Sequence, residues 1–309
     1  MTDWKQHHHD YLALRRGLGH GLADAARVLK FLVDELVTEE AEFLTVERMT
    51  AWVTAPDAEP GSTVWQRRAT AARGFARYLS GLEPRHELLP QGLITLHQSW
   101  RVPFIYSPAQ VSALMRDAGV NVRGAIPQAT YPTLIGLLSC TGMRIGEAIS
   151  LDKGDLDCGD NTLMIRNTKF GKTRQIPIDP ATVAALTAYL AQTANRSPAT
   201  EALLVSGTGR RLCYKSVNET FRHIVDRCGI GEGSARRPTL HSFRHSFAVT
   251  TLTRWHRQGR DVGALLPVLA TYLGHVEPRY TYWYLSATPE LMAAAAAKVP
   301  PVTIRREQR

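Results

Sequence analysis

Apolar and polar residues alternate with the period of an α-helix over much of the first hundred positions. In residues 21–40 the apolar side chains recur three or four positions apart with charged residues between them, which predicts an amphipathic helix. Thr45 begins a second, shorter segment of this kind, and residues 56–61 interrupt the pattern. Ser62 then stands where an N-cap residue would, and a third helix is predicted from there to about Ser80.

The segment of residues 83–108 has little periodicity and contains four prolines. Extended, proline-containing sequence between two helical regions is typical of an interdomain linker. A chain of 309 residues is also long enough for two domains. We therefore expect a boundary near residue 100, between a helical domain at residues 1–100 and a second domain at residues 101–309.

The second domain is expected to combine several helices with one β-hairpin. Ser107 and Pro108 have the sequence of an N-cap and a first helical position, and residues 131–139 read as an apolar helix. Two short strand-like runs, residues 163–165 and 175–178, flank a segment with a glycine and basic residues, which predicts a hairpin. Further helices are predicted at residues 181–193, 216–228, 239–255, 261–273 and, in an Ala-rich tail, 288–298. The fold class is therefore mostly α with a small antiparallel β-hairpin or sheet (α+β).

The charge of the chain favours a polyanionic partner. The formal net charge is +9 and the pI is about 9.6, which fits nucleic acid or an anionic membrane. The helix predicted at residues 62–80 carries arginines mostly off its apolar side, and such a face is either solvated or in contact with phosphates. Membrane binding through this helix would need a bulky apolar face free for insertion, which the pattern lacks. The candidate DNA contacts are Arg67, Arg68, Arg73 and Arg77.

Cysteine usage and hydropathy favour a cytoplasmic location. The four cysteines lie far apart without a CxxC pair, so they give neither a zinc spacing nor a disulfide framework, and reduced thiols are the simpler interpretation. No apolar stretch approaches the roughly 20 residues that span a bilayer, and no apolar signal segment is present near the N-terminus. The run His7, His8 and His9 could bind a metal, but a solvated terminal segment is the more ordinary explanation.

Two basic motifs of the second domain have both a chemical and an ordinary explanation. Arg144 follows a glycine, and Glu147 lies three residues later on the same helical face. In an arbitrary protein this would be a surface ion pair. Lys169 and Lys172 occupy the predicted hairpin tip, where lysines are ordinarily only solvated.

Three further motifs contribute histidine, arginine and tyrosine. His241 and Arg244 are spaced i and i+3 on one face of a predicted helix, although a lone histidine there is more often structural. In Leu273-Gly274-His275 the glycine predicts a helix end. An exposed histidine just beyond a helix end ordinarily has no special function. The aromatic run of residues 280–284 ends at Tyr284, and aromatic clusters are ordinarily part of a core.

The order of these motifs resembles that of a known enzyme family. An arginine, a hairpin lysine, HxxR, LGH and a tyrosine follow one another as in the tyrosine recombinases, or phage integrases, and the resemblance is strongest at residues 107–292. Any one motif is a weak match, whereas five in order are specific. The resemblance, especially to Xer-like recombinases, implies a tyrosine recombinase catalytic domain at residues 101–309. It also implies a helical, SAM-like core-binding domain at residues 1–100 that contacts DNA.

By this resemblance, Arg144 and Arg244 hold the scissile phosphate, and Glu147 supports the active-site helix and its arginine. A guanidinium stays charged and offers a planar fork of donors, which suits a phosphorane that gains negative charge. Lys169 matches the hairpin lysine that acts as general acid for the departing 5′ oxygen. Phe170 stands where the family commonly has glycine after this lysine, and it is the main departure from the pattern.

The resemblance also selects the nucleophile. His241 and His275 match the two histidine positions that bind the phosphate and assist proton transfer. Spacing from the LGH histidine matches Tyr284 to the attacking tyrosine, with Tyr282 as the second choice. Attack would leave a 3′-phosphotyrosyl link and a free 5′ hydroxyl, and the retained bond energy allows rejoining without ATP. No metal or other cofactor is expected, because arginines and histidines take the place of a Lewis acid.

The implied function is site-specific recombination of double-stranded DNA, in integration, excision or transposition. The family resemblance implies a homo- or hetero-tetramer of recombinases on paired sites, with no membrane partner. A topoisomerase of related mechanism is the alternative among enzymes, although the LGH motif favours a recombinase. A non-catalytic DNA-binding protein is the alternative outside enzymes, and the intact set of catalytic positions argues against it.

Overall fold

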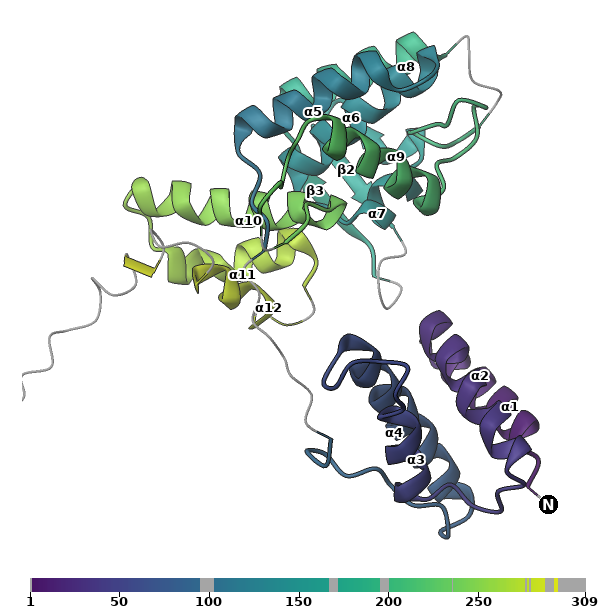
Figure 1. Ribbon diagram of the computed structural model, residues 1–309. Coiled ribbons are helices and arrows are strands. Elements are labelled where there is room, and N and C mark those ends of the chain that lie inside the picture. Colours follow the sequence, from purple (N-terminus) through teal and green to yellow (C-terminus); the bar gives the residue numbers. More distant parts are fainter. Residues whose placement is uncertain are drawn as a thin grey trace, which may run out of the picture. The chain divides into compact units, whose positions relative to one another are not determined.

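The computed structural model describes residues 2–94, 103–166, 172–194, 200–234, 236–275, 277, 279–286 and 292–293. The chain forms two compact units, Met1–Trp100 and Arg101–Arg309 (Figure 1). Two predicted features lie outside the described residues: Lys169 at the hairpin tip, and the tail helix at residues 288–298 except for positions 292 and 293. No helix in the described part of the chain is long and apolar enough to cross a membrane.

The described part of the first unit contains the helices α1 (Trp4–Gly17), α2 (Ala23–Thr38), α3 (Val46–Val53) and α4 (Thr63–Leu82). Their apolar faces meet in one core, in which Leu29, Met49 and Phe75 are fully buried. The apolar period predicts α2, α3 and α4, and the structure confirms them. Thr45 accepts a hydrogen bond from the backbone N–H of Arg48, as an N-cap should.

The N-terminal histidine run lies within helix α1, and its interpretation as a solvated terminal segment holds for the exposed His9 but not for His8. Trp4 is buried at the start of this helix, and its indole N–H donates to the carbonyl of Ala41 at 2.8 Å. His8 packs edge-on against Phe75 with ring centroids 6.3 Å apart, and burial lowers the pKa of this histidine. The polar histidines obscure the amphipathic pattern of α1, whose buried residues are Trp4, Tyr11 and Leu12.

The expected linker at residues 83–108 is too long, because both of its ends pack into the two units. The backbone N–H of Glu87 donates to the carbonyl of Leu44, and Leu89 and Ile94 are buried in the first core. On the other side, Tyr106 is buried in the second core. Proline interrupts helical periodicity without preventing burial, so the pattern alone overstates the linker.

The second unit is mostly helical, and Ser107 caps its first helix by accepting from the backbone N–H of Gln110. The helices are α5 (Pro108–Asn121), α6 (Ala125–Thr141), α7 (Ile145–Ser150), α8 (Pro180–Thr193), α9 (Tyr214–Arg227), α10 (Leu240–Arg257), α11 (Val262–Leu273) and α12 (Arg279–Tyr282). In the described part of this unit, η1 (Lys153–Asp155) and η2 (Trp283–Ser286) are 3₁₀ turns that follow α7 and α12.

A small antiparallel sheet accompanies these helices, in the order β1 (Leu156–Asp157), β2 (Thr162–Ile165) and β3 (Arg174–Pro177). Leu163 pairs with Ile176, and both side chains are buried. The predicted hairpin is β2 and β3. Strand β1 has two residues and is too short to leave an alternating pattern.

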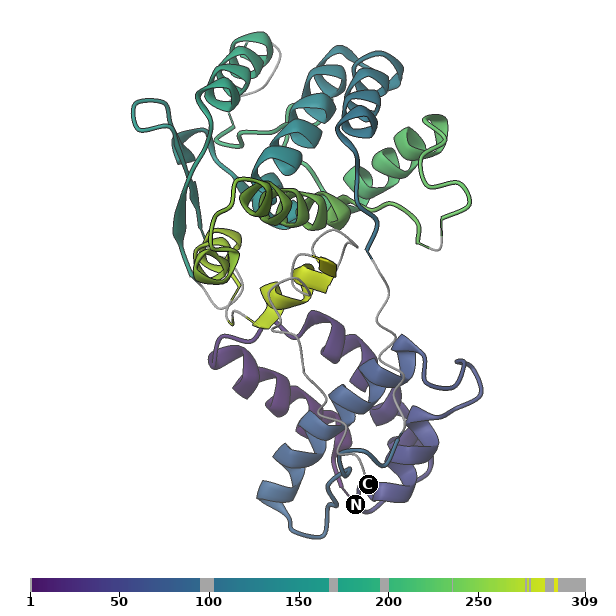
Figure 2. The same cartoon turned by 90° about the vertical axis from the view of Figure 1, so that its left-hand side faces the viewer.

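Helix α6 is the centre of the second unit, since it packs against α5, α8 and α10. Its apolar residues surround the helix rather than forming one stripe, as expected of a helix buried on several sides. At the other side of α10 lie α11 and the segment formed by α12 and η2 (Figure 2). The ends of α6 and α11 and the start of α10 supply the candidate site.

Candidate active site

The turn between α6 and α7 places Arg144. Gly142 ends α6 with a φ of 60°, in the left-handed region that favours glycine. A Cβ atom at this position would also meet the Phe247 ring at 2.6 Å, so two independent constraints require glycine. Arg144 follows as the N-cap residue of α7, with a side chain that is 34% exposed.

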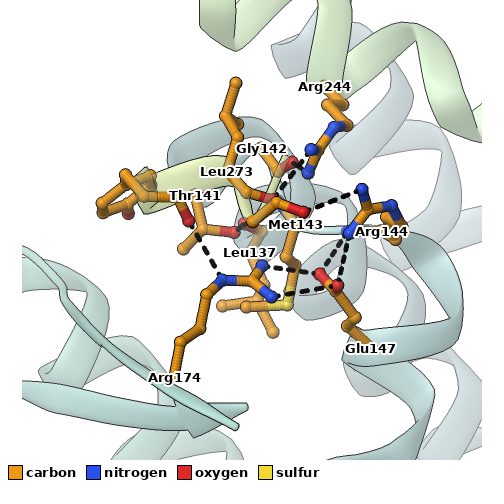
Figure 3. A network of polar contacts seen from close by, with 11 residues as sticks. Leu137, Thr141, Gly142, Met143, Arg144, Glu147, Arg174, Arg244 and Leu273 are labelled. Carbon is orange, nitrogen blue, oxygen red and sulfur yellow. Dashed lines mark hydrogen bonds and ion pairs between the residues drawn. The ribbon is translucent and has the colours of Figure 1, made fainter. Parts of the chain in front are cut away.

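Glu147 lies between two guanidinium groups (Figure 3). Arg144 donates to its carboxylate from Nη1 at 2.8 Å and from the backbone N–H at 3.0 Å. Arg174 donates from Nη1 at 3.1 Å and from Nη2 at 2.9 Å. Burial raises the pKa of the Glu147 carboxyl, but the hydrogen bonds and charges of both arginines outweigh it and hold the pKa below its ordinary value. The pair is therefore not a surface ion pair, because this carboxylate is buried.

Arg174 is a member of the site that the motif analysis missed. Its Nε donates to the carbonyl of Tyr272 at 3.1 Å, so the side chain joins β3 to the end of α11. The guanidinium also lies against Gly274, where a Cβ atom would meet its Nη1 at 2.7 Å. One signal could have identified it: Arg174 is two residues from the buried Ile176, on the same face of the strand.

Arg244 is buried at the centre of the site and is 1% exposed. Its Nη1 donates to the carbonyl of Gly142 at 3.1 Å and its Nη2 to the carbonyl of Leu273 at 2.8 Å. Burial, followed by the charge of Arg144, lowers the pKa of Arg244 to about 10, so it stays protonated at neutral pH. Arg244 thus holds together the C-terminal turns of α6 and α11.

The end of α11 places His275, as the LGH motif predicts. Gly274 has a φ of 71°, and the backbone N–H of His275 donates to the carbonyl of Ala270 at 2.9 Å. The Nδ1 atom of His275 lies 2.7 Å from the hydroxyl of Thr281, which is buried. These contacts fix the position of the imidazole on the side of α12.

Burial distinguishes Tyr284 from the neighbouring tyrosines. Tyr284 is 1% exposed, whereas Tyr280 and Tyr282 are each 50% exposed. Its ring stacks on that of His275 with centroids 6.5 Å apart and an interplanar angle of 12°. Burial raises the pKa of Tyr284 to about 12, against the opposing charges of Arg244 and Arg144.

Helix α10 brings two histidines to the same place. The rings of His241 and His245 lie 4.6 Å apart between centroids, one turn from each other along the helix. Surrounding protein desolvates His241 although solvent reaches it, and the charges of Arg244 and Arg144 add to this effect, which lowers the pKa of His241 to about 4. Burial, with the same surrounding charges, lowers the pKa of His275 to about 4.

His245 is the second residue that the motif analysis missed. Its Nδ1 atom lies 3.1 Å from the hydroxyl oxygen of Tyr284. Burial, followed by His241 and Arg244, lowers the pKa of His245 to about 3, so its imidazole is neutral at neutral pH. The spacing of four residues from His241 could have identified it, because residues i and i+4 share one helix face.

The remaining predicted site residues are Lys169 and four arginines of the first unit. The structure does not describe Lys169. The four arginines predicted to contact DNA belong to α4 in the first unit, where Arg67 is paired with Asp24 and Arg68 with Asp57. Arg73 donates to the carbonyl of Pro90, and Arg77 is exposed. Within the described ranges, no group of three His, Cys, Asp or Glu residues is placed to hold a metal ion.

Comparison with known proteins identifies the family. The family model described as the phage integrase family matches residues 107–290. A Sinorhizobium fredii protein, y4rB, whose name assigns it to the integrases and recombinases, is 35% identical over 97% of this chain and 98% of its own length. The chain belongs to the phage integrase family. The tyrosine recombinase XerD of Mycobacterium leprae is 27% identical to this integrase over 94% of this chain and 95% of its own length.

Solved structures share the fold of this integrase. The Tn1549 transposon integrase in complex with circular intermediate DNA matches with a TM-score of 0.66 at 17% identity, over 96% of this chain and 99% of that one. XerH bound to a palindromic difH substrate matches with a TM-score of 0.63 at 19% identity, over 82% of this chain and 70% of that one. The expected fold class is confirmed, and so is the expected enzyme class of tyrosine-type recombinase.

Proposed function

We propose that this integrase cleaves and rejoins double-stranded DNA at specific sites through a 3′-phosphotyrosyl intermediate on Tyr284, without metal or ATP. Integration, excision or transposition of mobile DNA would use this reaction. The observation that carries the assignment is the convergence of Arg144, Arg244, His275 and Tyr284 from four separate segments of the chain. A cytoplasmic location, where the DNA and the reduced cysteines would both be found, is part of the proposal.

The two arginines of the cluster suit a phosphodiester. Arg144 is partly exposed, and its Nη2 also donates to the carbonyl of Gly274 at 3.2 Å, so the guanidinium is held in place and yet reached by solvent. Arg244 has five N–H donors, of which the carbonyls of Gly142 and Leu273 take only some. Fixed guanidinium forks stabilise the charge that develops on a pentacoordinate phosphorus without reorganising in the reaction.

The reaction then requires one nucleophile and one acid. The hydroxyl oxygen of Tyr284 forms a bond to phosphorus while the bond from phosphorus to the 5′ oxygen breaks. Lys169 would give a proton to that departing oxygen, and His241 and His275 would bind the non-bridging oxygens. The reverse attack by a 5′ hydroxyl from another strand completes the exchange and releases the tyrosine.

The first unit is proposed to bind DNA through α4. Among its candidate arginines, Arg77 is exposed, whereas Arg67 and Arg68 are already paired with carboxylates. A phosphate would have to compete with Asp24 or Asp57 for those two side chains. Arg77 is therefore the strongest of the four candidates, followed by Arg73.

Exchange between two duplexes requires four strand cuts, and we propose that a homo- or hetero-tetramer of recombinases carries them out. The Ala-rich segment of residues 288–298 would dock on a neighbouring protomer. An isolated helix of this length is marginal in water, so it needs a partner surface. This segment begins only a few residues after Tyr284, which would couple the nucleophile to the neighbour.

The proposed function is tested with a nicked duplex that carries the DNA flanking the gene of this protein. Cleavage next to the nick releases a short fragment and traps the covalent adduct. We expect a protein–DNA adduct that survives denaturation, with a free 5′ hydroxyl on the released strand that a kinase labels directly. A 5′-phosphate at the break, or protein attached to the 5′ end, would contradict the proposal.

A further inference from the structure

A histidine that stands outside the HxxR and LGH motifs, His245, lies beside Tyr284, the proposed nucleophile. The Nδ1 atom of His245 lies 3.1 Å from the hydroxyl oxygen of Tyr284. The His245 ring also contacts Trp283 at 5.1 Å and His241 at 4.6 Å between centroids, so neighbouring aromatic rings hold its orientation. The Arg244 guanidinium, which also hydrogen-bonds Tyr284, can only donate, whereas Nδ1 of a neutral His245 can accept the tyrosine proton.

We propose that His245 accepts the proton of Tyr284 as this tyrosine attacks the scissile phosphate. This inference rests on the proposed function, in which Tyr284 is the nucleophile. As the bond from the tyrosine oxygen to phosphorus forms, the O–H bond breaks and the proton passes to Nδ1 of His245, which becomes an imidazolium. When the strand is rejoined, the bond from phosphorus to tyrosine breaks and the imidazolium returns the proton.

The protonation states fit this direction of transfer. With a pKa near 12, Tyr284 is almost entirely protonated at neutral pH, so attack needs a proton acceptor. His245 is neutral there, since burial and positive neighbours disfavour its charged form, and the same effects make it a weak base in the free protein. The groups that face it are His241 and Arg244 on its own helix, His275 from the end of α11, and Arg236 from the segment before α10.

Binding of DNA strengthens the acceptor. A phosphodiester brings a negative charge to the arginine cluster that otherwise opposes an imidazolium at His245. By Coulomb's law this charge favours protonation and raises the pKa of the histidine. The base therefore becomes stronger when the substrate is in place, and remains deprotonated in the free protein.

Two substitutions separate proton transfer from hydrogen bonding. The side-chain oxygen of Asn in His245→Asn can replace Nδ1 as an acceptor of the tyrosine hydrogen bond, but an amide does not take up the proton. His245→Phe removes both capacities. The matched control is His256→Asn, on the same helix and away from Tyr284.

The experiment measures single-turnover adduct formation on the nicked duplex as a function of pH, after DNA binding has been checked for each variant. At neutral pH we expect both His245 variants to form the adduct more slowly by a factor on the order of 10²–10³. The rate of His245→Asn should rise roughly tenfold per pH unit toward the pKa of Tyr284, because hydroxide then removes the proton. Wild type and His256→Asn should change much less over the same range.

A second substrate distinguishes activation of the nucleophile from protonation of the leaving group. A 5′-bridging sulfur in place of the oxygen leaves without protonation, so it rescues the loss of a general acid. The defect of His245→Asn should persist on this substrate. Rescue by sulfur, or a wild-type rate for His245→Asn at neutral pH, would overturn the inference.

A failure of this inference can be distinguished from a failure of the proposed function. An adduct on Tyr284 that forms equally well without His245 removes the proton acceptor and leaves the recombinase assignment intact. No adduct with the wild-type protein removes the proposed function itself. If His245→Phe does not fold, His245→Asn decides the question, because it keeps the hydrogen-bond acceptor.

Discussion

At the scale of single residues, the structural and chemical roles of Arg244 are the hardest to separate. Its side chain fixes two helix ends and is also the proposed ligand of the scissile phosphate. We expect Arg244→Lys to lose most cleavage, because an ammonium cannot reproduce a bidentate fork. Losing one such transition-state contact costs about 3 kcal/mol or more, which is roughly a hundredfold or greater loss in rate. The measurement is adduct formation at saturating protein.

Thermal unfolding of Arg244→Lys serves as the control for folding. A folded variant with near-normal cleavage would show that Arg244 only positions its helix. A variant that binds DNA but does not cleave it would place the loss in the transition state.

Glu147 gives a prediction about stability and pH. Its carboxyl has a lowered pKa in the folded protein, so its contribution to the free energy of unfolding is full above the ordinary value near 4.5 and is lost as the pH falls through the folded value. We expect Glu147→Gln to destabilise the protein by about 1–3 kcal/mol at neutral pH, since it leaves Arg144 and Arg174 without their carboxylate. The difference from wild type should shrink on acidification.

Urea unfolding at neutral and at acidic pH measures this effect, with Glu219→Gln at an exposed position as the matched control. A penalty for Glu147→Gln that is the same at both pH values would show that the lowered pKa of this carboxyl does not stabilise the fold.

At the scale of elements, the turn after α6 decides where Arg144 stands. Gly142→Ala places a Cβ atom 2.6 Å from the Phe247 ring in a left-handed backbone conformation. We expect a loss of roughly 2–4 kcal/mol in unfolding free energy, from backbone strain and overpacking together, and a fall in cleavage. Gly146→Ala, in the following helix and with no atom within 4 Å of its Cβ, should be neutral or stabilising. Equal stability of the two variants in denaturant unfolding would contradict this account.

The sequence predicts elements well where their pattern repeats. The amphipathic helices and the β2–β3 hairpin follow from periodicity and, at Ser107, from capping. Helix α1 was missed because polar residues, among them three consecutive histidines, occupy most of it, and β1 because two residues carry no period. The predicted linker was too long because Leu89 and Ile94 are buried through contacts with other helices, which the local sequence pattern does not reveal.

The site was predicted where a motif marks it, and helix and strand spacing were the weaker signals for Arg174 and His245. Arg144, Arg244, His275 and Tyr284 stand in ordered motifs, and the structure brings them together. The pairing of His245 with Tyr284 joins positions 39 residues apart and becomes visible only when α10 and η2 pack against each other. Arg174 likewise reaches Glu147 through tertiary folding alone.

At the scale of the whole molecule, the C-terminal tail gives a prediction about assembly. We expect deletion from Pro289 onward to leave binding to a single half-site largely intact and to abolish cooperative binding to a paired site, because the tail would dock on a neighbour. Gel-shift titration on one half-site and on two measures both quantities. Unchanged cooperativity would refute the exchange of tails, and loss of half-site binding would indicate that the tail stabilises its own domain.

The most direct test of the account is the identity of the nucleophile. Tyr284→Phe keeps the buried ring and removes only the attacking oxygen, so DNA binding should be retained while no covalent adduct forms on the nicked duplex. Tyr282→Phe, at an exposed position two residues away, should form the adduct as wild type does. Adduct formation by Tyr284→Phe at the wild-type level would contradict the central claim.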